Sequence, residues 1–239
     1  MNRPNRLVVV AGTGTEIGKT WVTCRILELA RARGLRVAAR KPAQSFAADS
    51  DAPKTQSVSN SLPENADRGR FELRSESTDA EQLARASGEA PQQVCPAHRW
   101  YPVAMAPPMA ADLLGRERLA LEELIREIRW PGNTDLGFVE TAGGLRSPIT
   151  HDADNTELIE NLAPDEVLLV ADAGLGTINA VRLSLAALAQ QRVCVFLNRY
   201  DPTNDLHVRN RRWLVDVYGF TTVTEAGQWL DQERLTSIR

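Results

Sequence analysis

Short apolar runs alternate with amphipathic segments along much of the chain. Residues 6–11 (RLVVVA) form a continuous apolar run that stops at a glycine-rich segment, as a buried parallel strand does. Between residues 19 and 33, Val22 and Ile26 recur at helical spacing, and Gly34 closes the stretch as a glycine after a helix does. The pattern therefore predicts a strand, a loop and a helix in that order.

The same alternation continues towards the C-terminus. Further strands are predicted at residues 36–41, 136–140, 167–171 and 193–197, and further helices at residues 78–86, 116–128 and 178–190. Strands that alternate with helices are typical of an α/β fold with a doubly wound, mainly parallel sheet and helices on both faces. Such sheets bind their ligands at the carboxyl ends of the strands, so we expect the site there.

One stretch, at about residues 46–77, does not follow this pattern. It is rich in Ser, Asp, Glu, Asn and Ala and has little apolar periodicity, which predicts a long loop or a partly ordered insertion. A substrate lid and a solvated insertion are both compatible with it. Because no linker-like stretch divides the chain, residues 1–239 are expected to form a single domain.

Composition narrows the classes of partner. The net charge of −3 gives no electrostatic case for nucleic acid or an anionic membrane surface. No apolar run approaches the ~20 residues that cross a bilayer, and the polar N-terminus lacks the apolar region of a signal peptide. Cys24, Cys95 and Cys194 are odd in number and widely spaced, so no disulfide framework is indicated. We expect a cytoplasmic protein with small-molecule partners, no nucleic acid and no membrane.

The strongest chemical signal is a glycine-rich segment between the first predicted strand and helix. Backbone N–H groups in such a loop surround phosphate oxygens, and the helix N-terminus adds a favourable dipole. Lys19 would neutralise charge on the β- and γ-phosphates, and the Thr20 hydroxyl would bind Mg²⁺. The segment therefore predicts a site for ATP or a close relative, with Mg²⁺. Its members are Gly12, Thr13, Gly14, Thr15, Glu16, Ile17, Gly18, Lys19 and Thr20.

Mg²⁺ prefers carboxylate, hydroxyl and phosphate oxygens, so Thr20 needs acidic partners. Glu140 ends a predicted apolar strand, where such a carboxylate is expected, and Asp79 opens a predicted helix. Asp79 has a plain alternative as a helix cap, together with Ser77 and Thr78. Lys41 follows another strand, where its alternative is a lysine that extends its ammonium to solvent.

The phosphate loop and several later segments resemble the corresponding segments of one protein family. Five residues separate the first and last glycines of the loop, one more than in the standard motif. The sequence of the loop resembles that of dethiobiotin synthetases. Segments similar to others of that family follow in its order. They are K-P-A-Q-S at 41–45, the segment from Y-P to M-A-P-P at 101–108, V-E-T-A-G-G at 139–144, G-L-G-T-I-N at 174–179, and Asn198.

The resemblance implies an enzyme that closes the ureido ring of dethiobiotin from 7,8-diaminopelargonic acid, CO₂ and ATP. It implies catalytic roles for Lys19, Lys41 and Ser45, Mg²⁺ ligation by Thr20, Asp79 and Glu140, and adenine recognition by Asn198. It also implies a homodimer in which a partner subunit holds the carboxylate tail of the diamine. The residues implied in substrate binding are Ser45, Gly143, Gly144, Gly174, Gly176, Thr177 and Asn179.

Two residues depart from the family pattern. Phe46 stands where a small residue usually follows the K-P-x-x-S segment, and Thr141 replaces the first glycine of E-G-A-G-G. Side chains of this bulk could reshape the substrate pocket.

Two other classes share the phosphate loop. A partitioning-type switch ATPase carries an early signature lysine in its loop, where this chain has residues 11–14 (AGTG). An ATP-dependent amide-forming enzyme of cobalamin biosynthesis usually adds a glutamine-hydrolysing domain, for which 239 residues leave no room.

Several other polar residues carry less weight. Cys95 and His98 form C-x-x-H without a second ligand pair of metal-site spacing, so no zinc site is expected. His151 and His207 are expected to be solvated residues rather than catalytic bases. The basic run at residues 209–212 is interpreted as the exposed face of a helix.

Overall fold

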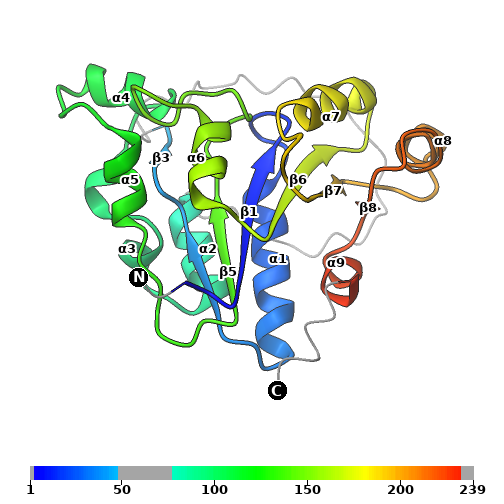
Figure 1. Cartoon of the computed structure of the whole chain (residues 1–239), viewed down its shortest axis with the longest axis horizontal. Coiled ribbons are helices and arrows are strands. Elements are labelled where there is room, and N and C mark those ends of the chain that lie inside the picture. The colour runs from blue at the N-terminus through cyan, green and yellow to red at the C-terminus, as the bar shows by residue number, and fades with distance from the viewer. Residues whose placement is uncertain (1–2, 48–76, 233–239) are drawn as a thin grey trace, which may run out of the picture.

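The centre of the fold is a parallel β-sheet (Figure 1), seen in a computed structural model that describes residues 3–47 and 77–232. Within that part of the chain the sheet has six strands in the order β2-β5-β1-β6-β7-β8, and every pair is parallel. The α/β fold class predicted from the alternating pattern is confirmed. The strands are β1 (Arg6–Gly12), β2 (Val37–Arg40), β5 (Leu136–Glu140), β6 (Glu166–Asp172), β7 (Val193–Asn198) and β8 (Thr222–Val223), and a separate parallel pair consists of β3 (Gln44–Ser45) and β4 (Trp100–Tyr101).

Helices cover both faces of the sheet. They are α1 (Lys19–Ala32), α2 (Asp79–Ser87), α3 (Pro91–Val94), α4 (Pro107–Leu113), α5 (Leu121–Glu127), α6 (Asn155–Leu162), α7 (Thr177–Ala186), α8 (Asp205–Arg212) and α9 (Ala226–Gln232), with a 3₁₀ turn η1 (Ala97–Arg99) and a π-helical turn η2 (Trp213–Val217).

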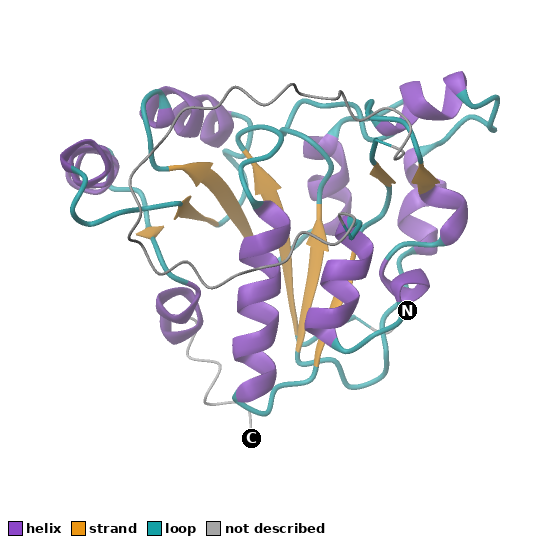
Figure 2. Cartoon of the chain, turned by 180° about the vertical axis from the view of Figure 1, so that it is seen from behind, coloured by secondary structure: helices purple, strands orange, loops and turns teal. Residues whose placement is uncertain are grey.

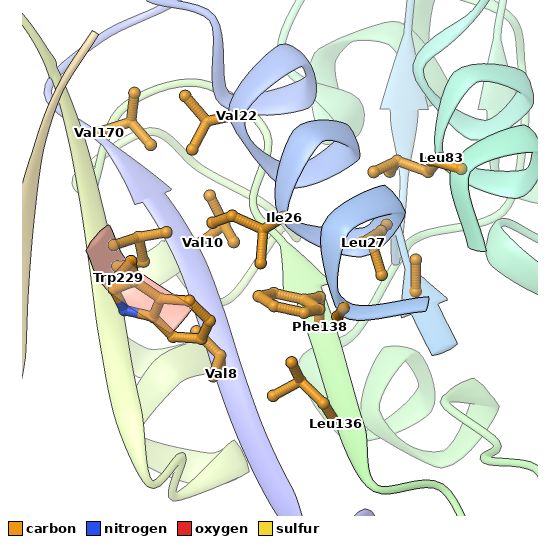
Figure 3. Close-up of a cluster of buried hydrophobic side chains, with 14 of the residues drawn as sticks. Val8, Val10, Val22, Ile26, Leu27, Leu83, Leu136, Phe138, Val170 and Trp229 are labelled. Atoms are coloured by element: carbon orange, nitrogen blue, oxygen red, sulfur yellow. The ribbon is translucent and has the colours of Figure 1, made fainter. Parts of the chain in front are cut away.

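One face of the sheet packs against α1, α2 and α9. Figure 2 shows α1 and α2 in front of the strands, and Figure 3 shows the buried side chains between them. Val10 of β1 and Phe138 of β5 meet Ile26 of α1, and Trp229 of α9 packs against Phe138 with 5.9 Å between ring centroids. These rings and branched chains are fully or almost fully buried, and burial of this kind contributes roughly 1.5–3 kcal/mol for each large side chain.

The opposite face packs against α6 and α7. The alternate residues of β1, including Leu7 and Val9, face a second apolar cluster with Ile159 of α6. Since β1 and β6 are buried on both faces, their sequences are nearly continuous apolar runs, as expected for central parallel strands. Because these strands pair in parallel, the carboxyl ends of β1, β5, β6 and β7 lie at one edge of the sheet.

Two predicted helices are shorter than their patterns suggested. The helix expected at residues 116–128 begins only at α5, because Leu119 N–H donates to His151 Nδ1 and Leu121 N–H donates to Asp152 Oδ1. The helix expected at residues 178–190 ends at Ala186, where Ala187 and Leu188 form tight turns instead. The strand predicted at residues 136–140 is confirmed residue for residue.

Most of the polar stretch at about residues 46–77 lies outside the described residues, so its interpretation stays a prediction, as does the single domain. Across the described ranges, no helix is both long enough and apolar enough to cross a membrane.

Candidate active site

The glycine-rich segment forms a loop between the end of β1 and the start of α1. Gly18 caps α1 with φ 87°, a left-handed conformation that favours glycine, and a Cβ there would collide with Asn198 Nδ2. Asn198, at the end of β7, donates through Nδ2 to Ile17 O at 2.8 Å. The loop is therefore held by the end of β7, two strands away from β1 in the sheet, and the N-terminus of α1 points at the site.

Lys19 turns back over this loop. Its Nζ donates to Gly14 O at 3.1 Å and to Gly143 O at 3.0 Å, so it bridges the loop after β1 and the loop after β5. Burial lowers the pKa of Lys19 to about 8, and the nearby Lys41 ammonium adds to the effect. An anionic group bound here would stabilise the charged form of the buried Lys19 ammonium.

Three oxygen-bearing side chains meet beside Lys19. Thr20 Oγ1 lies 2.9 Å from Asp79 Oδ1 and 2.8 Å from Glu140 Oε1. A hydroxyl has one proton, so it can donate to only one of these carboxylates. Hydroxyl and carboxylate oxygens are the ligands that Mg²⁺ prefers, so the three residues fit the predicted metal site.

Asp79 is not the cap of its helix. Thr78 caps α2 and forms a capping box with Glu81, which leaves the Asp79 carboxylate at the first helical position free to point at Thr20. The plain alternative for Asp79 is thus wrong, since its side chain serves the cluster and not the helix end.

Lys41 lies against the same two carboxylates. Its ammonium is almost fully buried, 2.8 Å from Asp79 Oδ2 and 2.7 Å from Glu140 Oε1. Burial by itself would lower the pKa of Lys41, but the two carboxylates outweigh it and raise the pKa above its ordinary value. The ammonium in turn lowers the pKa of Asp79. The alternative of a solvent-extended lysine is therefore wrong, and Lys41 remains a cation at neutral pH.

These groups open into one cavity of about 900 Å³ at the carboxyl edge of the sheet. Ser45 of β3 lines it, as does the segment around Met105 before α4, so part of the predicted substrate loop reaches the same space. The lining comprises Thr15, Glu16, Gly18, Lys19, Thr20, Lys41, Gln44, Ser45, Asp79, Gln82, Ala104, Met105, Ala106, Pro107, Glu140, Ala142, Gly143, Ser147, Pro148 and Arg199.

The two glycines after β5 pack against the phosphate loop. Gly143 has φ 73°, and its carbonyl accepts from Lys19. A Cβ on Gly144 would lie 3.6 Å from Gly14 Cα, so the two backbones run in close contact. Gly143 borders the cavity directly, whereas Gly144 supports the loop behind it.

The turn before α7 lies apart from this cavity. Gly176 caps α7 with φ 91°, Asn179 is exposed, and the Thr177 hydroxyl is buried with no hydrogen-bond partner among the described residues. Gly174 N–H donates to Asp172 Oδ1 at 2.8 Å. None of these four predicted substrate residues lines the described cavity of its own chain.

Phe46 and Thr141, which depart from the family pattern, both lie outside the lining of the cavity. Phe46 packs edge-on against Trp100, with 6.4 Å between ring centroids. The buried Thr141 hydroxyl donates to Val10 O at 3.3 Å, on the neighbouring strand. Neither belongs to the lining of the described cavity, so their bulk is accommodated away from it.

The other polar residues considered in the sequence lie outside the lining of this cavity. Cys95 is buried against backbone oxygens, while the exposed His98 faces Glu127 at 3.0 Å. His151 is not solvated as predicted, because its ring accepts from Leu119 N–H and lies 2.9 Å from Asp112 Oδ1. The basic run at residues 209–212 lies on α8.

Several residues that shape the site were not predicted from the sequence. Thr23 Oγ1 lies 2.9 Å from Lys19 O and 3.2 Å from Glu140 Oε2, one helical turn after Lys19. Arg199 follows Asn198 and donates to Glu16 O at 2.8 Å. Helical spacing and adjacency to a predicted residue were the available signals for these two. Asn155, whose Nδ2 donates to the carbonyls of Ala142 and Gly144 beside the site, had no such signal.

Comparison with known proteins identifies the family. A family model described as an AAA domain matches residues 6–214. An ATP-dependent dethiobiotin synthetase from Caulobacter vibrioides (strain NA1000 / CB15N) is 40% identical over 184 residues, covering 75% of this chain and 72% of that protein. The chain belongs to the dethiobiotin synthetase family. Another member, from Anaeromyxobacter sp. (strain K), is 34% identical over 206 residues, covering 84% of this chain and 79% of that synthetase.

Solved structures give a weaker likeness. The signal recognition particle receptor FtsY from Elizabethkingia anophelis in complex with GDP has a TM-score of 0.48 and 16% identity. The match covers 93% of this chain and 57% of that receptor. At this level the likeness carries no conclusion about the present chain.

Proposed function

We propose that this protein is an ATP-dependent dethiobiotin synthetase, which carboxylates 7,8-diaminopelargonic acid with CO₂ and closes the ureido ring. The observation that carries the proposal is the meeting of Lys19, Lys41 and the Thr20-Asp79-Glu140 cluster in one cavity beside a phosphate loop. Membership of the family supports the choice of reaction.

The reaction moves negative charge through the site in three steps. One substrate amine adds to CO₂ and loses a proton, which gives a carbamate. A carbamate oxygen then attacks the γ-phosphorus of ATP, and ADP leaves. The second amine attacks the carbamate carbon, inorganic phosphate leaves and the ring closes with loss of a proton. The protein supplies positioning and electrostatic stabilisation, as is usual for phosphoryl transfer.

The roles follow from charge and position. Lys19 is directed by the two carbonyls of Gly14 and Gly143, and it faces the phosphates that the loop surrounds. Lys41, held by two carboxylates at the cavity wall, stabilises negative charge on the carbamate and the transferred phosphoryl group. Ser45 lines the same wall and donates to the substrate. Adenine recognition is proposed for Asn198 through its Oδ1, because its Nδ2 donates to Ile17 O.

Thr20, Asp79 and Glu140 would hold Mg²⁺ together with phosphate oxygens. The ion supplies a fixed positive charge for the β- and γ-phosphates when it is bound. The assignment is supported by the meeting of one hydroxyl and two carboxylates, the oxygen ligands that Mg²⁺ prefers.

The functional unit is a homodimer in this proposal. The turn of Gly174, Gly176, Thr177 and Asn179 would bind the substrate carboxylate in the cavity of the partner subunit. Its backbone N–H groups lie at the start of α7, where an anion is favoured, and the exposed Leu175 and Leu183 offer apolar surface beside it.

Coupling of ATP use to the diamine tests the proposal. Purified protein with ATP, Mg²⁺ and bicarbonate should release phosphate only when 7,8-diaminopelargonic acid is added, with one phosphate for each dethiobiotin. Phosphate release that does not respond to the diamine would point to a switch ATPase.

A further inference from the structure

Asn155 lies at the start of α6 and is fully buried. Its Nδ2 contacts three carbonyl oxygens of one turn, at 2.7 Å for Ala142, 2.8 Å for Gly144 and 3.3 Å for Ser147. A carboxamide nitrogen carries two hydrogens, so the two short contacts are the principal hydrogen bonds. One side chain thus spans the turn that follows β5.

The turn at residues 142–147 is restrained in part by side chains, since Leu145 is buried in the second apolar cluster and Arg146 pairs with Asp154 at 3.0 Å. Gly144 N–H donates to Ser147 Oγ at 3.1 Å, and Ser147 N–H donates to Gly144 O at 3.0 Å. Both bonds close the turn on itself. The contacts from Asn155 hold the backbone carbonyls of the turn itself and tie them to α6, which is packed in the core through Leu158 and Ile159.

Burial of this amide has a cost. The Oδ1 atom of Asn155 is buried with no hydrogen-bond partner in the described structure, and an unpaired buried acceptor is unfavourable. An apolar residue would fill a core position without that cost. The bonds through Nδ2 are therefore the feature that distinguishes Asn155 from a plain packing residue.

The position of this turn determines where the Lys19 ammonium points. Gly143 lies between the two carbonyls that Asn155 holds most closely, and its own carbonyl accepts from Lys19 Nζ at 3.0 Å. An ammonium has three N–H donors, and the carbonyls of Gly14 and Gly143 take two of them. The third is left for a phosphate oxygen, and its direction depends on where Gly143 lies.

We propose that Asn155 is a positioning residue for phosphoryl transfer, which acts by fixing the Gly143 carbonyl that directs Lys19 at the γ-phosphate. The inference rests on the proposed function, because it assumes that Lys19 stabilises charge in that transfer. Asn155 does not touch the substrates. Its effect falls on the transition state, where the position of charge matters most.

Steady-state kinetics of Asn155→Ala measure this effect. We expect kcat to fall by about tenfold or more, with the KM values for ATP and the diamine within about threefold of wild type. Asn155→Ser keeps one O–H donor, so its kcat should lie between those of the wild type and Asn155→Ala. It also allows the effect to be measured if the alanine variant does not fold. Asn161→Ala is the matched control, since exposed Asn161 on the same helix donates to Glu157 O and does not touch the turn.

Amide hydrogen exchange gives a readout that does not depend on turnover. The amides of Gly144 and Ser147 should exchange faster in the Asn155 variants and at the wild-type rate in Asn161→Ala, with α1 protected in all. Unchanged exchange, or faster exchange with wild-type kcat, would overturn the inference. If the wild-type protein forms no dethiobiotin, the proposed function fails, while the exchange rates still decide whether Asn155 holds the turn.

Discussion

Lys41 Nζ lies 2.7 Å from Glu140 Oε1, an oxygen that is also 2.8 Å from the Thr20 hydroxyl. One carboxylate at the end of β5 therefore serves the lysine assigned to the carbamate and the hydroxyl assigned to the metal. The electrostatics of the two are linked, because any change to this carboxylate alters the charge that both experience.

Glu140→Gln should fold and need far more Mg²⁺. Asp79 still pairs with Lys41 at 2.8 Å, so the buried ammonium keeps one partner, but an amide oxygen is a weaker ligand for a hard cation. We expect the Mg²⁺ concentration for half-maximal activity to rise by about tenfold or more. Glu127→Gln, at a carboxylate paired with Arg99, is the control. An unchanged metal requirement would remove Glu140 from the ligand set.

Lys19→Ala should lose turnover. The ammonium that bridges Gly14 O and Gly143 O supplies positive charge to the phosphates, and its loss should cost several kcal/mol in the transition state, which is about a hundredfold or more in kcat. Initial rates at saturating ATP measure the change. Activity within about threefold of wild type would refute the role given to Lys19.

Much of this arrangement could be predicted from sequence because local rules govern it. Residues 136–140 are all buried and apolar up to Glu140, so the strand and its terminal carboxylate were evident. The phosphate loop was evident for the same reason, since Gly12 to Thr20 are contiguous. The contact of Asp79 with Thr20 was less evident, because helix capping offered an equal local explanation and the resemblance was needed to favour the metal site.

Other features depend on tertiary contacts and leave little trace in the sequence. The start of α5 is set by His151 and Asp152, about 30 residues further along the chain. Asn155 sits among polar residues at a helix start, where capping is the ordinary interpretation, and only the fold brings its amide to the turn after β5. Such roles follow from packing rather than from periodicity.

Binding of ATP should become weaker as the pH rises through about 8. Burial lowers the pKa of Lys19 to about 8, whereas phosphate oxygens favour the charged ammonium and raise that pKa on binding. The charge is present below pH 8 and is lost above it, so affinity falls there by at most about tenfold per pH unit, and binding takes up a proton. Calorimetry at pH 8.5 in two buffers of different ionisation enthalpy measures the uptake. Equal uptake in Lys19→Met would assign it to another group.

Leu183→Glu should separate the subunits and weaken diamine binding. Leu183 is 67% exposed on α7, the helix that begins at the proposed carboxylate site, and a charge there opposes burial in an interface. We expect a monomer with a raised KM for the diamine and nearly unchanged ATP affinity, because the phosphate loop is complete in one chain. Sedimentation and titration measure both quantities.

The control for the interface is Leu206→Glu, on α8, which should remain dimeric. A monomeric Leu183→Glu variant with wild-type affinity for the diamine would show that the turn before α7 does not serve a partner subunit.

The central claim is most directly tested by following carbon from bicarbonate into product. The wild-type protein is incubated with 7,8-diaminopelargonic acid, isotope-labelled bicarbonate, Mg²⁺ and ATP, and the product is analysed by mass spectrometry, with Lys19→Ala alongside. The predicted result is dethiobiotin that carries the label in its ureido carbon, formed with ADP and phosphate by the wild type and nearly absent with the variant. Hydrolysis of ATP without labelled dethiobiotin would contradict the proposed function.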